Sequence, residues 1–174
     1  MKLMSIFLIT AILTGDQSMN ARAEVKEKKA IQKFIHTYYD VLSKGDTSQL
    51  MDIYWEGATI SSHVPLEQNG KPQVSVLNVV DFCSWISQES KNFESMKMTS
   101  IQVDLQIYMD IAQVWSVASV KEKRHDGKEE NLRTLDCFLM INHEGRWRII
   151  AHVWTMEASD QPLIPSKKKK GANG

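Results

Sequence analysis

A hairpin pattern near the C-terminal end limits the possible folds more than any other feature of this chain. Residues 132–141 and 146–156 both show the alternation of a β-strand, and Gly145 lies in the short connection between them. Glycine readily adopts the left-handed conformation that follows a type I turn in a three-residue hairpin loop. We therefore expect a three-residue loop that places Asn142 opposite Arg146.

The expected register separates the hairpin into two faces. One face is wholly apolar and is assigned to the core; it collects Leu135, Cys137, Leu139, Ile141, Trp147, Ile149, Ala151 and Val153. A two-residue loop would shift the pairing by one residue and place Arg148 among these side chains, which favours the longer loop. On the other face, Asp136 lies directly opposite His152, and Trp154 follows further along the same strand.

The preceding part of the chain predicts helices followed by long strands. The expected elements are an amphipathic helix over 25–43 ended by Gly45, a second helix capped by Asp46 or Thr47, a strand over 58–62, a loop over 64–72, a third helix over 79–88 and strands over 101–107 and 111–124. This order predicts an α+β fold with the helices packed on one face of a curved sheet.

The first residues have the layout of a signal peptide. Lys2 precedes an apolar run over 3–13, and the small-x-small triplet Ala21-Arg22-Ala23 follows a polar stretch. The run is shorter than the roughly 20 apolar residues that span a bilayer as a helix. We expect residues 1–23 to be removed after Ala23 and the protein to be periplasmic or secreted, the alternative being an N-terminal extension of a cytoplasmic protein.

Composition indicates one globular domain, which we place at residues 24–158. The 174 residues are 43% hydrophobic and 24% charged, and 21 basic residues balance 21 acidic ones, so the charge favours no nucleic-acid partner. Residues 159–174, with Lys167 through Lys170, are expected to form a disordered tail. Cys83 and Cys137 would pair in an oxidising compartment or stay buried as free thiols.

Three segments, in this order, resemble the nuclear transport factor 2-like superfamily, especially its SnoaL-like bacterial members. They are FIHTYYDVLSKGD (34–46), DIAQV (110–114) and GRWRIIAH (145–152). The resemblance implies a cone in which a curved antiparallel sheet wraps three N-terminal helices, leaves a pocket at its open end and commonly dimerises through its outer face. Members include ketosteroid isomerases, polyketide cyclases, dehydratases, epoxide hydrolases and noncatalytic proteins, so the fold leaves the function open.

Asp136 and His152 are the candidate catalytic residues. A carboxylate that accepts a hydrogen bond from an imidazole orients it and raises its basicity, which gives a possible general base. The alternative is a solvated or interface pair worth about 0.2–1 kcal/mol. The apolar face opposite is the expected core, which favours this alternative, although a bulge in the last strand would turn His152 inward.

Candidate ligand-binding residues are aromatic or histidine side chains expected near the mouth of the cone. They are Tyr39, Tyr54, Trp55, His63, Trp85, Trp115 and Trp154. Aromatic rings with polar tips suit a pocket for a flat, mostly apolar ligand. Packing in an ordinary core is the alternative for each of them.

Several sharper chemistries lack their motifs in this sequence. It contains no His-Glu-x-x-His or Cys-x-x-Cys spacing, no Gly-x-Ser-x-Gly elbow and no glycine-rich phosphate loop, so we expect no metal and no cofactor. No complete catalytic motif is present either, and the question of an enzyme stays open.

Three classes of function remain. They are a pocket for a small apolar or amphipathic molecule, an acid–base isomerase, cyclase or dehydratase, and an interaction module that uses Phe138, Met140, Ile150 and Trp154 to contact a second copy or another protein. We favour an exported, homodimeric, ligand-binding protein without stable membrane insertion.

Overall fold

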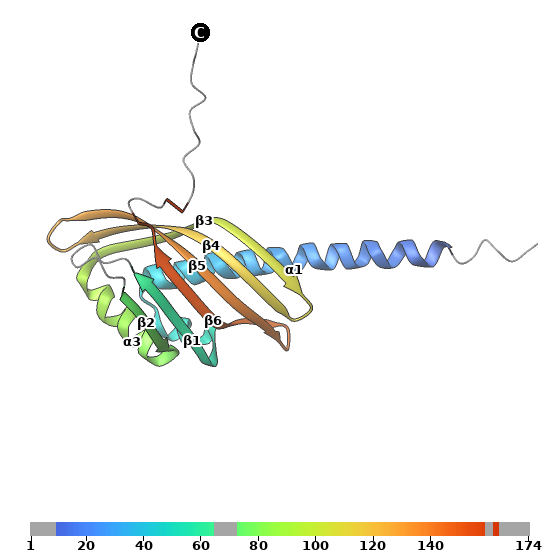
Figure 1. Cartoon of the computed structure of the whole chain (residues 1–174), viewed down its shortest axis with the longest axis horizontal. Helices are drawn as coiled ribbons and strands as arrows, with labels where there is room; N and C mark the ends of the chain where they lie inside the picture. Colours follow the sequence, from blue (N-terminus) through green and yellow to red (C-terminus); the bar gives the residue numbers. More distant parts are fainter. Residues whose placement is uncertain (1–9, 65–72, 159–161, 164–174) are drawn as a thin grey trace, which may run out of the picture.

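The computed structural model describes residues 10–64, 73–158 and 162–163, with side chains from residue 23 onward. In chain order the elements are α1 (Thr10–Lys44), α2 (Thr47–Ile53), β1 (Tyr54–Val64), β2 (Gln73–Asn78), α3 (Val79–Glu89), the short 3₁₀ helix η1 (Ser90–Asn92), β3 (Phe93–Tyr108), β4 (Ile111–Arg124), β5 (Glu129–His143) and β6 (Arg146–Met156). The six strands form one curved sheet in the order β2-β1-β6-β5-β4-β3, with the helices on one side of it (Figure 1).

This architecture confirms the expected α+β cone. Neighbouring strands are antiparallel except β1 and β6, which run parallel, so the sheet is mixed rather than wholly antiparallel. The strand β2 was not expected, and β1 and β3 begin earlier than predicted. Most of the expected loop over 64–72 and nearly all of the expected tail over 159–174 lie outside the described residues.

Helix α1 packs one apolar stripe into the concave side of the sheet. Its buried residues are Ile31, Ile35, Tyr38, Tyr39, Val41 and Leu42, at the spacing of an amphipathic helix. Gly45, at φ +62°, ends the helix, and the Asp46 carboxylate caps α2 by accepting a hydrogen bond of 3.1 Å from the Gln49 amide. These boundaries confirm the predicted corner between the two helices.

The N-terminal part of α1 extends beyond the sheet (Figure 1) and includes residues 10–23 of the expected signal peptide. Residues 1–9 lie outside the described part of the chain, and cleavage after Ala23 stays a prediction.

Within the described residues, none of the helices has both the length and the apolar character needed to span a bilayer.

The β5–β6 turn is shorter than the sequence suggested. It has two residues, Glu144 at φ +53° and Gly145 at φ +76°, and His143 pairs with Arg146. Positive φ at both central residues defines a type I′ turn, whose twist matches that of the flanking strands. The predicted three-residue loop, and the pairing of Asn142 with Arg146, are therefore wrong.

A bulge in β6 then changes which residues face inward. Met140 pairs with Ile149 but Leu139 pairs with Ala151, so Ile150 has no partner on β5. Before the bulge Ile149 is buried, and after it His152 is buried while Val153 is 52% exposed. The bulge thus turns His152 inward.

The expected assignment of the hairpin faces is accordingly reversed along β5. Thr134, Asp136, Phe138 and Met140 are buried inside the cone, whereas Leu139 lies on the outer face. Because Phe138 and Met140 are inside, they cannot form the interaction surface proposed for this face from the sequence. Both faces carry apolar residues, so hydrophobicity alone could not identify the inner one.

Both cysteines are free. Cys83 is buried in α3 and Cys137 is partly buried on β5, so of the two alternatives the structure has the free thiols and not the disulfide.

Candidate functional site

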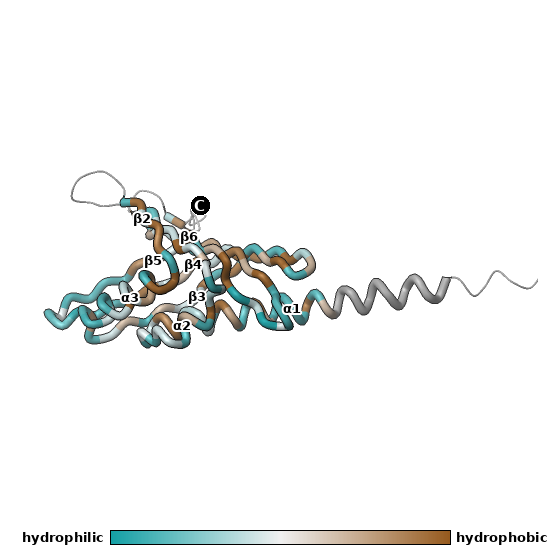
Figure 2. The backbone as a smooth tube through the Cα atoms, turned by 90° about the horizontal axis from the view of Figure 1, so that it is seen from below, coloured by the Kyte–Doolittle hydropathy of each residue, from teal (hydrophilic) through white to brown (hydrophobic). Residues whose placement is uncertain are grey.

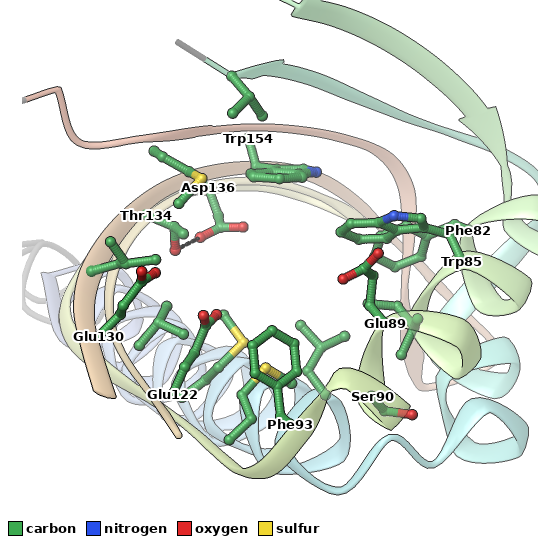
Figure 3. A pocket seen from close by; sticks show the side chains of 18 of the residues that line it. Phe82, Trp85, Glu89, Ser90, Phe93, Glu122, Glu130, Thr134, Asp136 and Trp154 are labelled. Atoms are coloured by element: carbon green, nitrogen blue, oxygen red, sulfur yellow. Dashed lines mark hydrogen bonds between the residues drawn. The ribbon is translucent and has the colours of Figure 1, made fainter. Parts of the chain in front are cut away.

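A cavity of about 390 Å³ opens between α3, the end of α1 and the concave side of the sheet (Figure 3). Its buried end is formed by Thr134 and Asp136 of β5 and His152 of β6. Its walls are mainly aromatic rings and methionines, namely Phe82, Trp85, Phe93, Met96, Met98, Trp154 and Met156. Its open end carries charged residues of α3 and of the β4–β5 hairpin, whose charged tip is the hydrophilic left-hand end of the molecule in Figure 2.

Asp136 and His152 meet at the buried end of the cavity. They are diagonal neighbours, because the register pairs Phe138 with His152 and Asp136 with Trp154. The His152 Nε2 lies 2.9 Å from Asp136 Oδ1, and its Nδ1 lies 2.9 Å from the Tyr54 hydroxyl. The ring of His152 also stacks on Phe138, with centroids 4.5 Å apart.

The second oxygen of Asp136 is also occupied. The Tyr39 hydroxyl donates to Oδ2 at 3.0 Å and the Thr134 hydroxyl donates to it at 2.9 Å. We call Asp136, His152, Tyr39, Tyr54 and Thr134 the buried polar network. A carboxylate can only accept these bonds, so His152 donates to Asp136 from Nε2, and its Nδ1 shares a hydrogen bond with the Tyr54 hydroxyl. Every polar atom of the network that lies inside the cone therefore has a partner.

The tyrosines of this network are held in their protonated form. Burial, followed by the negative charge of Asp136, raises the pKa of Tyr39 far above its usual range. Burial is also the largest cause of the raised pKa of Tyr54 and of the adjacent Tyr38. The hydroxyl groups of Tyr39 and Tyr54 therefore stay protonated and available as hydrogen-bond donors at every physiological pH.

Three aromatic rings form a continuous wall of the cavity. Trp85 stacks on Trp154 with centroids 6.2 Å apart and on Phe82 with centroids 5.9 Å apart. Phe82 and Trp85 come from one face of α3 because they are three residues apart, and Trp154 reaches them from β6 beyond the bulge. A second cavity of about 260 Å³ borders the same three rings and is lined by β1 and β2.

The open end is acidic. Glu89 of α3, Glu122 of β4 and Glu130 of β5 direct their carboxylates into the cavity (Figure 3). Burial raises the pKa of Glu122, and the charge of Glu130 adds to the shift, while Arg124 opposes it. The guanidinium of Arg124 lies over the ring of Phe93, 5.1 Å from its centroid.

One known protein family matches most of this chain. Residues 26–155 match the family described as "Putative lumazine-binding". The chain belongs to this family. A sequence comparison with curated proteins gives no match.

Comparison with solved structures shows which fold this chain shares with them. A scytalone dehydratase-like protein from Novosphingobium aromaticivorans has a TM-score of 0.67 at 11% identity, over 84% of this chain and 94% of its own. A nuclear transport factor 2-like protein from Salmonella enterica has a TM-score of 0.64 at 12% identity, over 85% and 99%. An NTF-2 like protein of unknown function from Silicibacter pomeroyi has 0.55 at 19%, over 77% and 98%. This lumazine-binding family member therefore has the nuclear transport factor 2-like fold, as the sequence resemblance predicted.

The structure brings six of the nine predicted site residues together in this lumazine-binding family member. Asp136, His152, Trp85 and Trp154 line the cavity. Tyr39 and Tyr54 lie behind it and hydrogen-bond to the first two.

The other three predicted ligand-binding residues lie elsewhere. Trp55 packs edge-on against His143 and beneath Arg148, His63 is exposed on β1, and Trp115 is 46% exposed on the outer face of the sheet. The expectation of one shared pocket does not hold for them, because an aromatic type near a strand end does not determine the face on which it lies.

Sequence reasoning missed the first half of β3 and the acidic residues. Met96 and Met98 alternate as strand residues do, but the intervening Lys97 and the polar residues around them hid the pattern, and the strand was expected only from Ile101. Glu122 and Arg124 lie at the end of the expected strand over 111–124 and Glu130 follows the turn, but nothing in the sequence indicates that all three line the cavity.

In the part of the chain that the structure describes, no group of three or more histidine, cysteine or acidic side chains is arranged to hold a metal ion.

Proposed function

We propose that this protein binds a flat, mostly apolar small molecule in the cavity of about 390 Å³. The stacked surface of Phe82, Trp85 and Trp154 carries the proposal, because it offers a planar ligand an extended apolar contact beside a small number of fixed polar groups. The cavity volume lies within the range of roughly 300–1,000 Å³ that is usual for small-molecule sites.

The family name supports the same class of ligand. Lumazine is a flat two-ring heterocycle, and it is the natural first probe for a member of a family described by lumazine binding. The proposal concerns the class of flat molecules, of which lumazine is one.

Tryptophan fluorescence and titration calorimetry test this binding. We expect at least one ligand of a panel of lumazine and other flat heterocycles to quench the fluorescence, and Trp85→Ala to weaken its binding about tenfold. Trp115→Ala, on the outer face, is the matched control and should leave the affinity unchanged. The proposal fails if no member of the panel binds the folded protein or if both variants weaken binding equally.

An acid–base enzyme is the second candidate, favoured by the position of Asp136 and His152 in the cavity wall. Both ring nitrogens of His152 are already engaged, so a ligand can reach this histidine only where Tyr54 or Asp136 gives up its bond. Mass spectrometry and NMR of bound ligands would reveal isomerisation or loss of water. Conversion by the wild type that His152→Gln abolishes would support the enzyme; binding without conversion by the wild type would reject it.

We also propose a homodimer formed through the outer face of the sheet. The register lays Trp115, Cys137 and Val153 side by side across three strands, with Leu139 adjacent, and these residues lie outside the cone. An apolar patch of this kind on the outer face of a sheet is typical of an interface between protein chains.

Export is part of the proposal as well. A protein cleaved after Ala23 would begin at Glu24 and, among the residues of α1 whose side chains are described (23–44), would retain all the buried ones, from Ile31 onward. N-terminal sequencing of the protein from the periplasm or medium tests this. A start at residue 24 supports export, whereas an intact N-terminus in the cytoplasm contradicts it.

A further inference from the structure

The charge of the cavity exceeds what a neutral ligand would require. Carboxylates enter its open end from three separate elements, with Glu89 on α3, Glu122 on β4 and Glu130 on β5 (Figure 3). Glu130 pairs with Lys128, but among the described residues neither Glu89 nor Glu122 forms an ion pair. Helix α3 and the paired strands β4 and β5, in which Glu122 lies opposite Glu130, thus bring like charges together at an apolar cavity, where water screens them less.

The aromatic wall adds to this negative potential. The faces of tryptophan and phenylalanine rings are the negative ends of their quadrupoles. Trp85 is 39% exposed and Trp154 lies stacked beside it, so both rings are accessible from the cavity. One cation–π contact is already present in the cavity wall, because the Arg124 guanidinium lies over the ring of Phe93.

Arg124 offsets only part of the acidic charge. It is the one lysine or arginine among the cavity-lining residues in the described part of the chain, against Glu89, Glu122, Glu130 and Asp136. Its guanidinium lies over the ring of Phe93, 5.1 Å from the centroid. Figure 3 shows that Phe93 lies across the cavity from Trp154.

We propose that the cavity selects flat molecules that carry a positive charge, with the ring against Trp85 and Trp154 and the cationic group among Glu89, Glu122 and Glu130. This inference rests on the proposed function and names its ligand class as flat aromatic compounds that bear an alkylammonium or quaternary ammonium group. Such a ligand removes the repulsion between the carboxylates and gains a cation–π contact with the same rings.

The electrostatics of Glu122 agree with this placement. Burial, followed by repulsion from Glu130 and then from Glu89, raises its pKa despite the nearby Arg124. A cation bound at the open end would reverse the effect of these neighbours and lower the pKa of Glu122, which is the behaviour of a carboxylate that gains a partner.

Three naphthalene probes of nearly equal shape test the inference. They are naphthyltrimethylammonium, its neutral isostere tert-butylnaphthalene, and naphthoate, each titrated into the full-length protein by calorimetry. We expect the ammonium probe to bind about tenfold more tightly than the neutral isostere, and naphthoate to bind more weakly than either. The preference for the cation should decrease as the salt concentration rises.

Matched variants locate the source of this preference. Glu89→Gln and Glu122→Gln should each reduce it to about threefold, with little effect on the neutral probe. Glu129→Gln is the control, since Glu129 is exposed and adjacent to Glu130 on β5 but does not line the cavity. Circular dichroism confirms that each variant is folded.

The outcomes separate this inference from the proposed function. If the neutral probe binds as tightly as the ammonium probe, or if Glu129→Gln reduces the preference as much as Glu122→Gln does, the cationic ligand class is wrong while the binding of flat molecules stands. If none of the three probes binds and the heterocycle panel fails as well, both proposals fall.

Discussion

Asp136 is buried at the inner end of the cavity and accepts three hydrogen bonds there, which limits the residues that can replace it. His152, Tyr39 and Thr134 all point donors at the carboxylate. A buried donor without an acceptor costs about 1–3 kcal/mol, so the network is as much a structural device as a feature of the site.

Asp136→Asn should destabilise the fold by about 2–4 kcal/mol, because an amide presents its own N–H groups to at least one of the three donors. Thr134→Val, which removes a single bond, should cost about 1 kcal/mol. Urea unfolding measures both. Asp104→Asn is the control, since Asp104 accepts only from Gln102 in an exposed pair, and a change there as large as that of Asp136→Asn would contradict this explanation.

The buried tyrosines predict a loss of stability at alkaline pH. Tyr38, Tyr39 and Tyr54 have a raised pKa in the folded protein, so above about pH 10 the unfolded chain releases phenolic protons that the folded state retains. Their contribution is complete below the unfolded pKa and is lost as the pH rises above it, at about 1.4 kcal/mol per pH unit for each tyrosine.

Tyr39→Phe should therefore reduce the slope of stability against pH above about pH 10 by one tyrosine's share. Denaturant titrations at a series of alkaline pH values measure this slope. Tyr108→Phe is the control and should leave the slope unaltered, because Tyr108 is 77% exposed. Equal slopes for wild type and Tyr39→Phe would show that Tyr39 is not shielded from solvent.

Among the elements, the β5–β6 turn contains a residue that suits it poorly. Glu144 has φ +53° in a type I′ turn, where asparagine is strongly preferred over residues with a longer side chain. Glu144→Asn should raise the free energy of unfolding by about 0.5–1 kcal/mol, visible as a higher denaturation midpoint. Glu144→Ala keeps the strain and should give no gain. An equal gain from alanine would assign the effect to charge instead.

This turn also shows where sequence reasoning reached its limit. The helical spacing in α1 and α3, the cap at Asp46 and the extent of β6 were all predictable from the sequence, because each depends on local preferences. A glutamate in a left-handed conformation and an unpaired Ile150 leave no such local signal, since tertiary packing imposes both.

The candidate site was also predictable only in part, for the same reason. Residue type identified Asp136, His152, Trp85 and Trp154 as members of a site, but the face on which the first two lie depended on the bulge. The acidic residues of the open end could not be assigned to a cavity without knowing that α3, β4 and β5 converge there.

For the whole molecule, the outer sheet face predicts the state of association. Leu139→Glu and Val153→Glu should convert a dimer to a monomer, because each buries a charge in the proposed apolar interface. Analytical ultracentrifugation measures the mass. Both variants should keep the ligand affinity of the wild type, since neither residue lines the cavity.

Val80→Glu is the matched control for this surface. Val80 is also an exposed valine, but it lies on α3 and not on the sheet, so its replacement should leave the mass unchanged. A wild-type protein that sediments as a monomer at high concentration would contradict the dimer and leave the pocket proposal intact.

The unpaired residue Ile150 divides β6 into two parts that differ in which residues face the interior. Before Ile150, the odd-numbered residues Trp147 and Ile149 face inward and pack in the core. After it, the even-numbered residues His152 and Trp154 face inward and line the cavity. Substitutions in the part of β6 after Ile150 can therefore alter the cavity without altering the core contacts of Trp147 and Ile149. If Ile150 paired with Leu139 in a regular ladder, Ala151 and Val153 would face the interior in place of His152 and Trp154, so this one unpaired residue separates a polar cavity from an apolar one.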